Sequence, residues 1–349
     1  MTRRFRTADF EFAYDPDAVA QRPLPDRSGG RLLVLDRRSG ALAHHRFGDF
    51  PALVHPGDLL VLNESRVLPA RLLGRRAGGG AAEVFLVHED PDGTWLAMVR
   101  PGSRLRPGRT IRFGEDGAAE IVAYAPGGMR RVRFLGSGGA HAIMERHGTV
   151  PLPPYIDRPP EPGDRERYQT VYAAVDGSVA APTAGLHFTS ELLARLARRG
   201  VGVAKVVLHV GPGTFKPVEA DDPAQHLMHA EWYDVPADTA AAINRAKGEG
   251  GRVWAVGTTV ARTLETVATA PAGPPGPARE MRGWTSLFIY PPYTFRIVDA
   301  LLTNFHRPRS TLLMLVAAFA GYDLTMNAYR EATAAGYRLF SYGDAMAIT

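Results

Sequence analysis

The chain of 349 residues contains no cysteine, and only three of its 41 basic residues are lysines. Without thiols, the chain cannot form disulfide bonds, use a thiolate nucleophile or bind zinc through cysteine. The lack of cysteine fits a reducing compartment, so we expect a cytoplasmic protein. Nearly all of the positive charge is carried by arginine.

Long hydrophobic runs are also missing. The longest, residues 312–320, is far shorter than the ~20 residues that span a bilayer, and it predicts a buried helix instead. Near the start, Arg3, Arg4 and Arg6 are not followed by the apolar run of a secretory signal.

Three familiar motifs do not occur. No Gly-x-x-x-x-Gly-Lys loop is present, which argues against a P-loop nucleotide site. No Gly-x-Gly-x-x-Gly follows a predicted strand, which disfavours nicotinamide enzymes and Rossmann-type methyltransferases. No Gly-x-Ser-x-Gly elbow is present, which disfavours an α/β-hydrolase.

The composition that remains is that of a globular protein, with 45% hydrophobic and 22% charged residues. Residues 71–134 read as short strands separated by Gly and Pro turns, with no helical period. The expected strands cover residues 82–88, 95–100, 110–113, 119–124 and 129–134. This pattern predicts a small, mostly antiparallel β-barrel or sandwich.

The rest of the chain alternates helices and strands. Strands are expected at 31–35, 59–62, 203–210, 252–256, 286–290, 297–302 and 337–342. Helices are expected at 140–147, 190–199, 237–247, 259–268, 310–319 and 325–334. This alternation predicts an α/β domain with a parallel sheet, barrel-like or open. We assign residues 1–62 and 148–349 to this discontinuous domain and residues 63–147 to an inserted β-barrel domain.

The most unusual stretch is residues 177–189, which consists almost entirely of small residues and then delivers His187 just before a helix. Thr189 or Ser190 is a suitable N-cap for that helix, and Gly200 is placed to end it. Small side chains let a ligand approach the backbone, and a helix N-terminus favours negative charge. The residues alone do not separate this interpretation from an ordinary tight turn with a packed histidine.

Further candidates follow expected strands, where ligands lie in α/β folds. His209 precedes the loop 211–215 and is either a site residue or a core histidine. His229, Glu231 and Tyr233 would share one face of a strand and could transfer protons. A metal site of His226, His229 and Glu231 matches no standard zinc spacing, so we predict no metal.

Residues 257–259 could hold a carboxylate or phosphate. Asp344 is either an acid of the site or a solvated end of the chain.

Charge is unevenly distributed. Residues 66–133 contain 12 arginines and 7 acidic residues, an excess that equals the net charge of +5 of the whole chain. A local basic surface suits a polyanion such as RNA, although arginine is favoured throughout this chain.

Taken together, these segments resemble the queuosine-pathway S-adenosylmethionine:tRNA ribosyltransferase-isomerase family. The resemblance is carried, in order along nearly the whole chain, by residues 57–61, 63–71, 151–156, 168–173, 177–189, 208–211, 213–215, 255–259, 262–265, 303–306, 310–321 and 341–346. It implies an α/β-barrel-like domain with a smaller inserted β-barrel. It also implies transfer of the ribosyl part of S-adenosylmethionine to the aminomethyl group of a 7-deazaguanine at the tRNA wobble position. Adenine and methionine leave, epoxyqueuosine forms, and S-adenosylmethionine is consumed as a co-substrate without a metal.

The resemblance, together with the candidates above, gives three sets of expected site residues. The proton-transfer candidates are His187, His209, Glu231 and Asp344, with their roles unassigned. The S-adenosylmethionine contacts are Ala181, Pro182, Thr183, Gly185, Gly211, Gly213, Thr214, Phe215, Gly257, Thr258 and Thr259. The base and tRNA contacts are Asn63, Arg66, Arg71, Arg100, Tyr155, Tyr168, Asn304 and His306.

The chain departs from the family pattern at a few positions. It has Glu64 and Ser65 where the family usually has Asp-Thr, Pro292 where Gly is usual, and Arg307 where Leu is common. A paralogue acting on another nucleoside, a methyltransferase and a non-catalytic tRNA-binding protein are the alternatives. We expect a monomer whose partners are tRNA and S-adenosylmethionine, with no membrane association.

Overall fold

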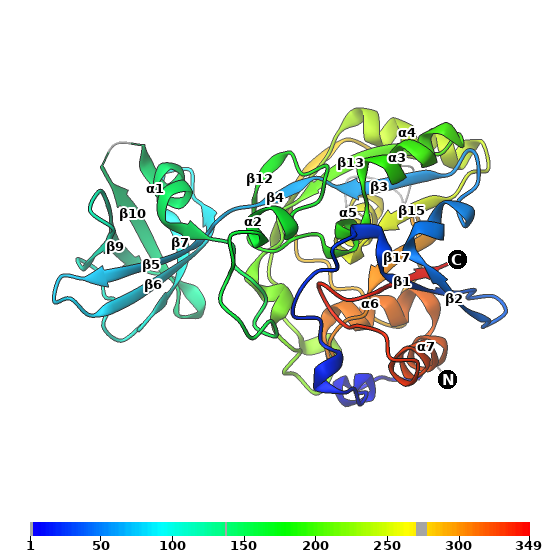
Figure 1. The fold of residues 1–349 in the computed structure, drawn as a ribbon, viewed down its shortest axis with the longest axis horizontal. Coiled ribbons are helices and arrows are strands. Elements are labelled where there is room, and N and C mark those ends of the chain that lie inside the picture. Colours follow the sequence, from blue (N-terminus) through cyan, green and yellow to red (C-terminus); the bar gives the residue numbers. More distant parts are fainter. Residues whose placement is uncertain (1–2, 137, 270–277) are drawn as a thin grey trace.

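The computed structural model describes residues 3–136, 138–269 and 278–349. The molecule has two parts, a large α/β body and a small β-barrel that projects from one end of it (Figure 1). This confirms the expected class, a mixed α/β protein with a small all-β barrel.

The body is built on a nine-stranded sheet with the order β16-β14-β13-β3-β15-β17-β18-β1-β2. The bounds are β1 Arg31–Leu35, β2 Leu42–Arg46, β3 Leu59–Asn63, β13 Gly202–Leu208, β14 Glu231–Val235, β15 Val253–Val256, β16 Met281–Thr285, β17 Ala300–Asn304 and β18 Ala345–Ile348. The central strands β13, β3, β15 and β17 run parallel to one another. Strand β18 is antiparallel to β17 but parallel to β1.

Strand β3 shows why this sheet lies in the middle of the body. All five of its residues are buried, and alternate side chains enter different cores. Leu59 and Val61 pack in one apolar cluster, whereas Leu60 and Leu62 pack in another. Both faces are therefore covered, as is usual for parallel strands joined by helices.

The helices are α1 Gly139–His147, α2 Asp164–Arg167, α3 Ser190–Arg198, α4 Ala237–Gly248, α5 Thr258–Thr269, α6 Thr311–Ala320 and α7 Tyr322–Ala334. The N-cap expected for α3 is confirmed, since Thr189 Oγ1 accepts the Leu192 N–H at 3.1 Å. Among the described residues, no single helix is long and apolar enough to cross a membrane. The pair α6 and α7 passes that test only when joined, and it is bent by 115°.

The barrel comprises β5 Arg71–Arg76, β6 Ala81–Glu89, β7 Trp95–Arg100, β8 Thr110–Phe113, β9 Gly117–Tyr124 and β10 Arg130–Leu135. All its pairings are antiparallel, and pairing of β5 with β8 closes the ring. Strand β4 (Ser65–Val67) leads in from β3 and pairs with β12 (Val175–Ser178), while β11 (Gly148–Thr149) pairs with β5 on the way out. The limits expected for the insertion, residues 63 and 147, stay a prediction.

Three expected strands are wrong or misplaced. Residues 286–290 form no regular structure, and the strand there is β16, at 281–285. Residues 297–302 overlap β17, which begins only at Ala300. Residues 337–342 form no strand apart from one bridge between Leu339 and Val19. The last strand is instead β18, a buried apolar run.

Asp344 therefore precedes the last strand rather than following it. Its carboxylate accepts the backbone N–H groups of Arg31 and Arg338, both at 2.8 Å, and the side chain is 1% exposed. These bonds turn the chain at 338–344 so that β18 can enter the sheet beside β1. The alternative of a solvated chain end is thereby excluded.

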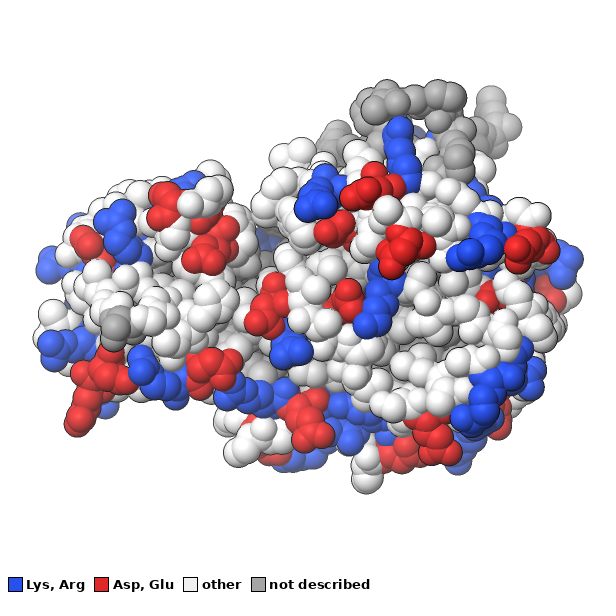
Figure 2. All heavy atoms as spheres, turned by 90° about the horizontal axis from the view of Figure 1, so that it is seen from above, with Lys and Arg blue, Asp and Glu red and all other residues white. Residues whose placement is uncertain are grey.

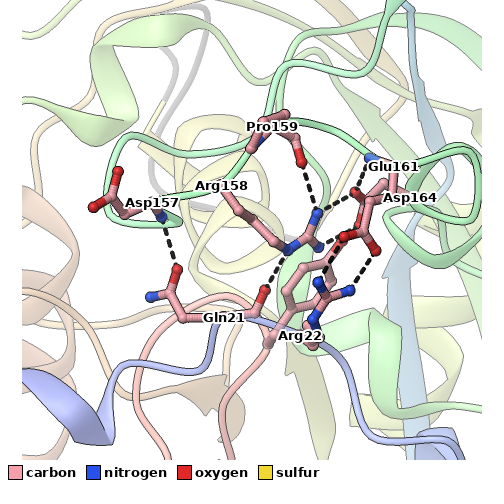
Figure 3. A network of polar contacts seen from close by, with 8 residues as sticks. Gln21, Arg22, Asp157, Arg158, Pro159, Glu161 and Asp164 are labelled. Atoms are coloured by element: carbon pink, nitrogen blue, oxygen red, sulfur yellow. Dashed lines mark hydrogen bonds and ion pairs between the residues drawn. The ribbon is translucent and has the colours of Figure 1, made fainter.

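A polar network ties the 157–164 loop to the N-terminal segment (Figure 3). Arg158 and Asp164 form a largely buried ion pair at 2.6 Å, and Arg158 Nε donates to Gln21 O at 2.9 Å. Tyr342 donates to Asp164 at 3.0 Å, and Arg22 pairs with Glu161. We call these contacts the strap. They join three segments that are far apart in sequence, and they support the neighbouring Tyr155, which reaches the site described next.

Candidate active site

A cavity of about 750 Å³, counted with the space that opens to solvent, lies beyond the carboxyl ends of β15 and β17. Its walls come from six segments, namely residue 155 and residues 180–184, 210–217, 257–259, 303–312 and 340–341. The expected site residues that line it are Tyr155, Ala181, Pro182, Thr183, Thr214, Gly257, Thr258, Thr259, Asn304 and His306. Lys216, Arg307, Phe340 and Ser341 also line it and were not expected as contacts.

The inner end of the cavity is formed by the start of α5. Gly257 has a φ of 96°, which favours glycine, and it turns the chain from β15 into the helix. A Cβ at Gly257 would lie only 3.7 Å from the Cβ of Ala184, so the two loops approach closely. The first-turn N–H groups of a helix have no intrahelical acceptors and favour a negative or electron-rich ligand. The hydroxyl of Thr259 is buried without a hydrogen-bond partner in the described structure.

Asn304 forms part of the wall and is only 1% exposed. Its Nδ2 lies 3.3 Å from Phe340 O and 3.4 Å from His187 Nε2, whereas its Oδ1 is buried without a partner among the described residues. An unsatisfied buried carbonyl oxygen is costly unless a ligand or water completes it. Asn304 is therefore well placed to receive a hydrogen bond from a bound molecule.

His187 lies behind Asn304 and lines a smaller neighbouring cavity of about 340 Å³, which shares Ser341 with the main one. Its ring stacks on Phe47 with centroids 4.7 Å apart. Burial lowers the pKa of His187 to about 4. The imidazole is neutral at pH 7, so it can accept a proton or donate a neutral hydrogen bond.

His306 is the second buried imidazole of the site. Its Nε2 lies 2.7 Å from Thr303 Oγ1, and its backbone N–H donates to Tyr329 Oη at 3.0 Å. Burial lowers its pKa to about 3, so it too is neutral at pH 7. The site thus offers two uncharged imidazoles that do not repel a positively charged substrate.

A side chamber of about 340 Å³ contains the only expected acid that reaches this region among the described residues. Glu231 and Arg262 form a buried ion pair, and Glu231 Oε1 also accepts the Gly211 N–H at 2.7 Å. Burial lowers the pKa of Arg262 to about 10, which leaves it cationic at pH 7. Thr214, Thr258 and Thr259 line both spaces.

Comparison with known proteins shows the same family along the whole chain. The family model described as queuosine biosynthesis protein matches residues 7–348. Relatives named S-adenosylmethionine:tRNA ribosyltransferase-isomerase are 53% identical in Symbiobacterium thermophilum, over 98% of this chain and 99% of the relative, and 50% identical in Moorella thermoacetica, over the same shares. A crystal structure titled S-adenosylmethionine tRNA ribosyltransferase, from Thermotoga maritima, aligns with 39% identity and a TM-score of 0.57, over 98% of this chain and 100% of that one.

The chain belongs to the queuosine biosynthesis protein family. This confirms the resemblance, and with it the enzyme class, since the curated relatives carry the name of a transferase-isomerase. The roles of individual residues stay a prediction for this family member, and the structure separates those that reach the cavity from those that do not.

Four expected residues, three of them buried and His209 partly exposed, are not among those that line the cavity. Asn63 uses its amide on the Leu208 backbone, with Nδ2 to Leu208 O at 2.9 Å and Oδ1 to Leu208 N at 3.1 Å. Tyr168 is completely buried and packs edge-on against Tyr342. His209 lies 2.8 Å from Ser65 Oγ and stacks on Trp232. Asp344, as described above, holds the backbone.

Three glycines have local packing reasons. A Cβ at Gly185 would lie 2.0 Å from Tyr172 Oη, and one at Gly213 would lie 2.5 Å from the His229 ring. Gly211 donates its N–H to Glu231. Phe215, whose side chain lies outside the description, is in the same loop as Thr214.

The arginines expected to contact tRNA lie on the barrel and its connection. Arg66 pairs with Asp176 at 3.6 Å and Arg71 with Glu83 at 3.0 Å, while Arg100 is exposed at the end of β7. His229 is also exposed and lies before β14, so it does not share a strand face with Glu231 and Tyr233, contrary to expectation. Within the described ranges, no three His, Asp or Glu side chains are grouped so as to hold a metal.

Arg262 is the residue that sequence reasoning missed most clearly. It lies 31 positions from its partner Glu231, and nothing local to either residue predicts the pair. One feature of the sequence could have pointed to Arg262 as a site residue. It lies one turn after Thr258, in the helix that begins at the candidate ligand loop 257–259.

Proposed function

We propose that this protein transfers and isomerises the ribosyl group of S-adenosylmethionine onto the aminomethyl group of 7-aminomethyl-7-deazaguanine at the tRNA wobble position. Adenine and methionine are released and epoxyqueuosine-tRNA is formed. A C–N bond to the amine and a second new bond from the deprotonated C5′ carbon within the ribosyl group are made, while the bonds from the ribosyl group to adenine and to the methionine sulfur are broken. Of the two protons lost, one from C5′ and one from the amine, adenine takes one and solvent the other. The names of the relatives support this reaction, and the cavity supplies a site of suitable chemistry.

The observation that carries the proposal is one neutral imidazole in the cavity wall and a second directly behind it. S-adenosylmethionine carries a sulfonium, whose charge would be repelled by imidazolium. His187 and His306 are both neutral at pH 7 because burial lowers the pKa values. The sulfonium acidifies the neighbouring C5′–H, and a neutral imidazole can accept that proton. His187 lies directly behind the cavity wall, with its Nε2 3.4 Å from Asn304 Nδ2, and it is our candidate for this role.

The polar groups that have no partner in the described structure suit the nucleoside part. Asn304 Oδ1 can accept a hydrogen bond from an exocyclic amine, and Thr259 Oγ1 can donate to a ring nitrogen or a ribose oxygen. Both residues line the same cavity. Departing adenine needs a proton while the attacking amine loses one, so the site must both accept and deliver protons. Glu231 pairs with Arg262 and accepts the Gly211 N–H, and these contacts suit it to orienting groups.

The test is to incubate the protein with S-adenosylmethionine and a tRNA bearing the aminomethyl-deazaguanine, and to measure free adenine and methionine. Release of both, equal in amount to modified tRNA, is expected. The matched control is the same tRNA with guanine at the wobble position, which lacks the amine and should give no product. Formation of S-adenosylhomocysteine would instead identify a methyltransferase, and tRNA binding without adenine release would identify a binding protein.

A further inference from the structure

Two tryptophans lie side by side on the face of the sheet that points away from α5. Trp232 of β14 and Trp284 of β16 are directly opposite each other in the antiparallel register. Their neighbours Glu231 and Thr285 are also paired and are buried, so by strand alternation the two indoles share the other face. Trp284 is 56% exposed, which is unusual for so large an apolar side chain.

Two histidines extend this pair at both ends. The His209 ring stacks on Trp232, with centroids 5.2 Å apart and planes 20° apart. His88, from β6 of the barrel, meets Trp284 edge-on with centroids 5.4 Å apart. The aromatic row, defined as His88, Trp284, Trp232 and His209, therefore runs from the barrel to the body.

The row lies close to the catalytic chemistry but on the opposite side of the strand. Glu231 lines the side chamber, whereas the next residue, Trp232, belongs to the row. His209 is followed by Val210, which lines the main cavity. A ligand that occupies the row and a ligand in the cavity would thus be separated by little more than one strand.

The charge of the barrel that contributes His88 to the row matches a polyanion. Residues 66–133 carry 12 arginines against 7 acidic residues, and His88 belongs to this barrel. In the described structure, nine of these arginines form no ion pair with a carboxylate, namely Arg75, Arg76, Arg100, Arg104, Arg106, Arg109, Arg112, Arg130 and Arg133. Figure 2 shows basic side chains interspersed with acidic ones over the barrel.

We propose that the aromatic row is a stacking platform for unpaired nucleobases of the tRNA anticodon loop, next to the base that enters the cavity. The proposal rests on the proposed function and adds the surface that holds the RNA. A base can react in a closed cavity only after leaving the stack, and its neighbours then lose a stacking partner. Exposed indole faces replace that partner, while arginines hold the phosphates.

An alternative role for Trp284 is to fasten the barrel to the body through His88. The contact with His88 is edge-on and leaves more than half of the indole exposed. A fastening contact would be expected to cover the ring. The open face of Trp284 is therefore better explained by a flat, aromatic ligand than by the contact between the two parts.

The experiment compares Trp284→Ala, Trp284→Phe and the control Tyr124→Ala, which removes another exposed aromatic side chain of similar accessibility on the barrel. Binding of unmodified tRNA is measured by titration, without turnover. Loss of one stacked base should weaken binding about 5- to 150-fold for Trp284→Ala. Trp284→Phe should recover most of the affinity but lose part of the tryptophan fluorescence quenching on RNA binding. Tyr124→Ala and S-adenosylmethionine binding should not change.

Equal tRNA affinity for Trp284→Ala and the wild type would overturn the proposal. So would a loss that Trp284→Phe fails to restore, or one accompanied by a change in the radius of gyration of the free protein, since both would indicate the fastening role. Because binding is measured without turnover, these results are independent of the adenine-release assay. Tight, Trp284-dependent binding with no adenine release would leave the platform standing and refute the proposed function.

Discussion

Around the cavity the imidazoles are buried and neutral, whereas on the barrel nine of the arginines have no carboxylate partner within the described structure. The cavity is formed by the ends of strands and the starts of helices, where side chains are buried. The barrel is a curved sheet whose arginines mostly face solvent and stay charged. Such a division suits an enzyme with two substrates of opposite character, a small cation that must be desolvated and a large polyanion that must be attracted.

The largest expected effect is on turnover, after a substitution among the neutral imidazoles at the cavity. His187→Ala should lower turnover by about 10²- to 10⁴-fold if the imidazole transfers a proton in the reaction. Single-turnover adenine release would measure this. His44→Ala, which removes a half-exposed imidazole bonded to Tyr337, is the control and should be nearly silent. Full turnover in His187→Ala would remove this residue from the mechanism.

The same burial should make the protein sensitive to acid. The pKa of His187 is about 4 in the folded state against 6.5 in the unfolded state, so only the unfolded chain binds the proton between these values. The contribution of neutral His187 to the free energy of unfolding is complete above pH 6.5. It is lost as the pH falls toward 4, and the total loss is roughly 3 kcal/mol. Urea titrations at pH 7 and pH 4.5 should show the loss, and His187→Gln should reduce it. An unchanged pH slope in that variant would contradict the assignment.

Gly185 tests whether small residues near the cavity serve the ligand or the fold. Gly185→Ala puts a methyl group against the Tyr172 hydroxyl and should cost about 1–3 kcal/mol of stability. Adding Tyr172→Phe removes that oxygen and should restore part of the loss. Thermal melts of the single and double variants measure this. If Gly185→Ala melts like the wild type and impairs only S-adenosylmethionine binding, the ligand explanation is favoured.

The smallest effect is expected on the salt dependence of tRNA binding, after substitution of arginines on the barrel. Changing Arg100, Arg104 and Arg106 to Gln should lower the dependence of tRNA binding on salt by about two in the log–log slope. The variant would then lose roughly twentyfold less affinity than the wild type between 50 and 200 mM salt. Changing Arg195, Arg198 and Arg199, exposed on or beside α3, alters the net charge equally and is the control. Identical slopes for the two triple variants would show that the barrel has no special part in binding.

How far the sequence predicts the structure depends on whether the signal is local. The cap at Thr189, five of the six barrel strands and the turn at Gly257 are local, and they were predicted, whereas β5 was missed. The loops at 211–215 and 257–259 were found because they follow apolar strands, and the loop at 177–189 because of its small residues. Strand β18 was missed because a uniformly buried run of four residues has no alternation to distinguish it. The Glu231–Arg262 pair and the hydrogen bonds of Asp344 depend on tertiary contacts, which no local pattern reveals.

Strand β18 lies between β17 and β1, so the last residues of the chain join its first strands to the rest of the sheet. During synthesis, β1 and β2 can pair with each other early, but they cannot enter the sheet until β18 has left the ribosome. Tyr342, which completes the strap, emerges at almost the same time. The sheet and the cavity wall are therefore completed only once residues 340–348 are in place, and a variant that lacks these residues has neither.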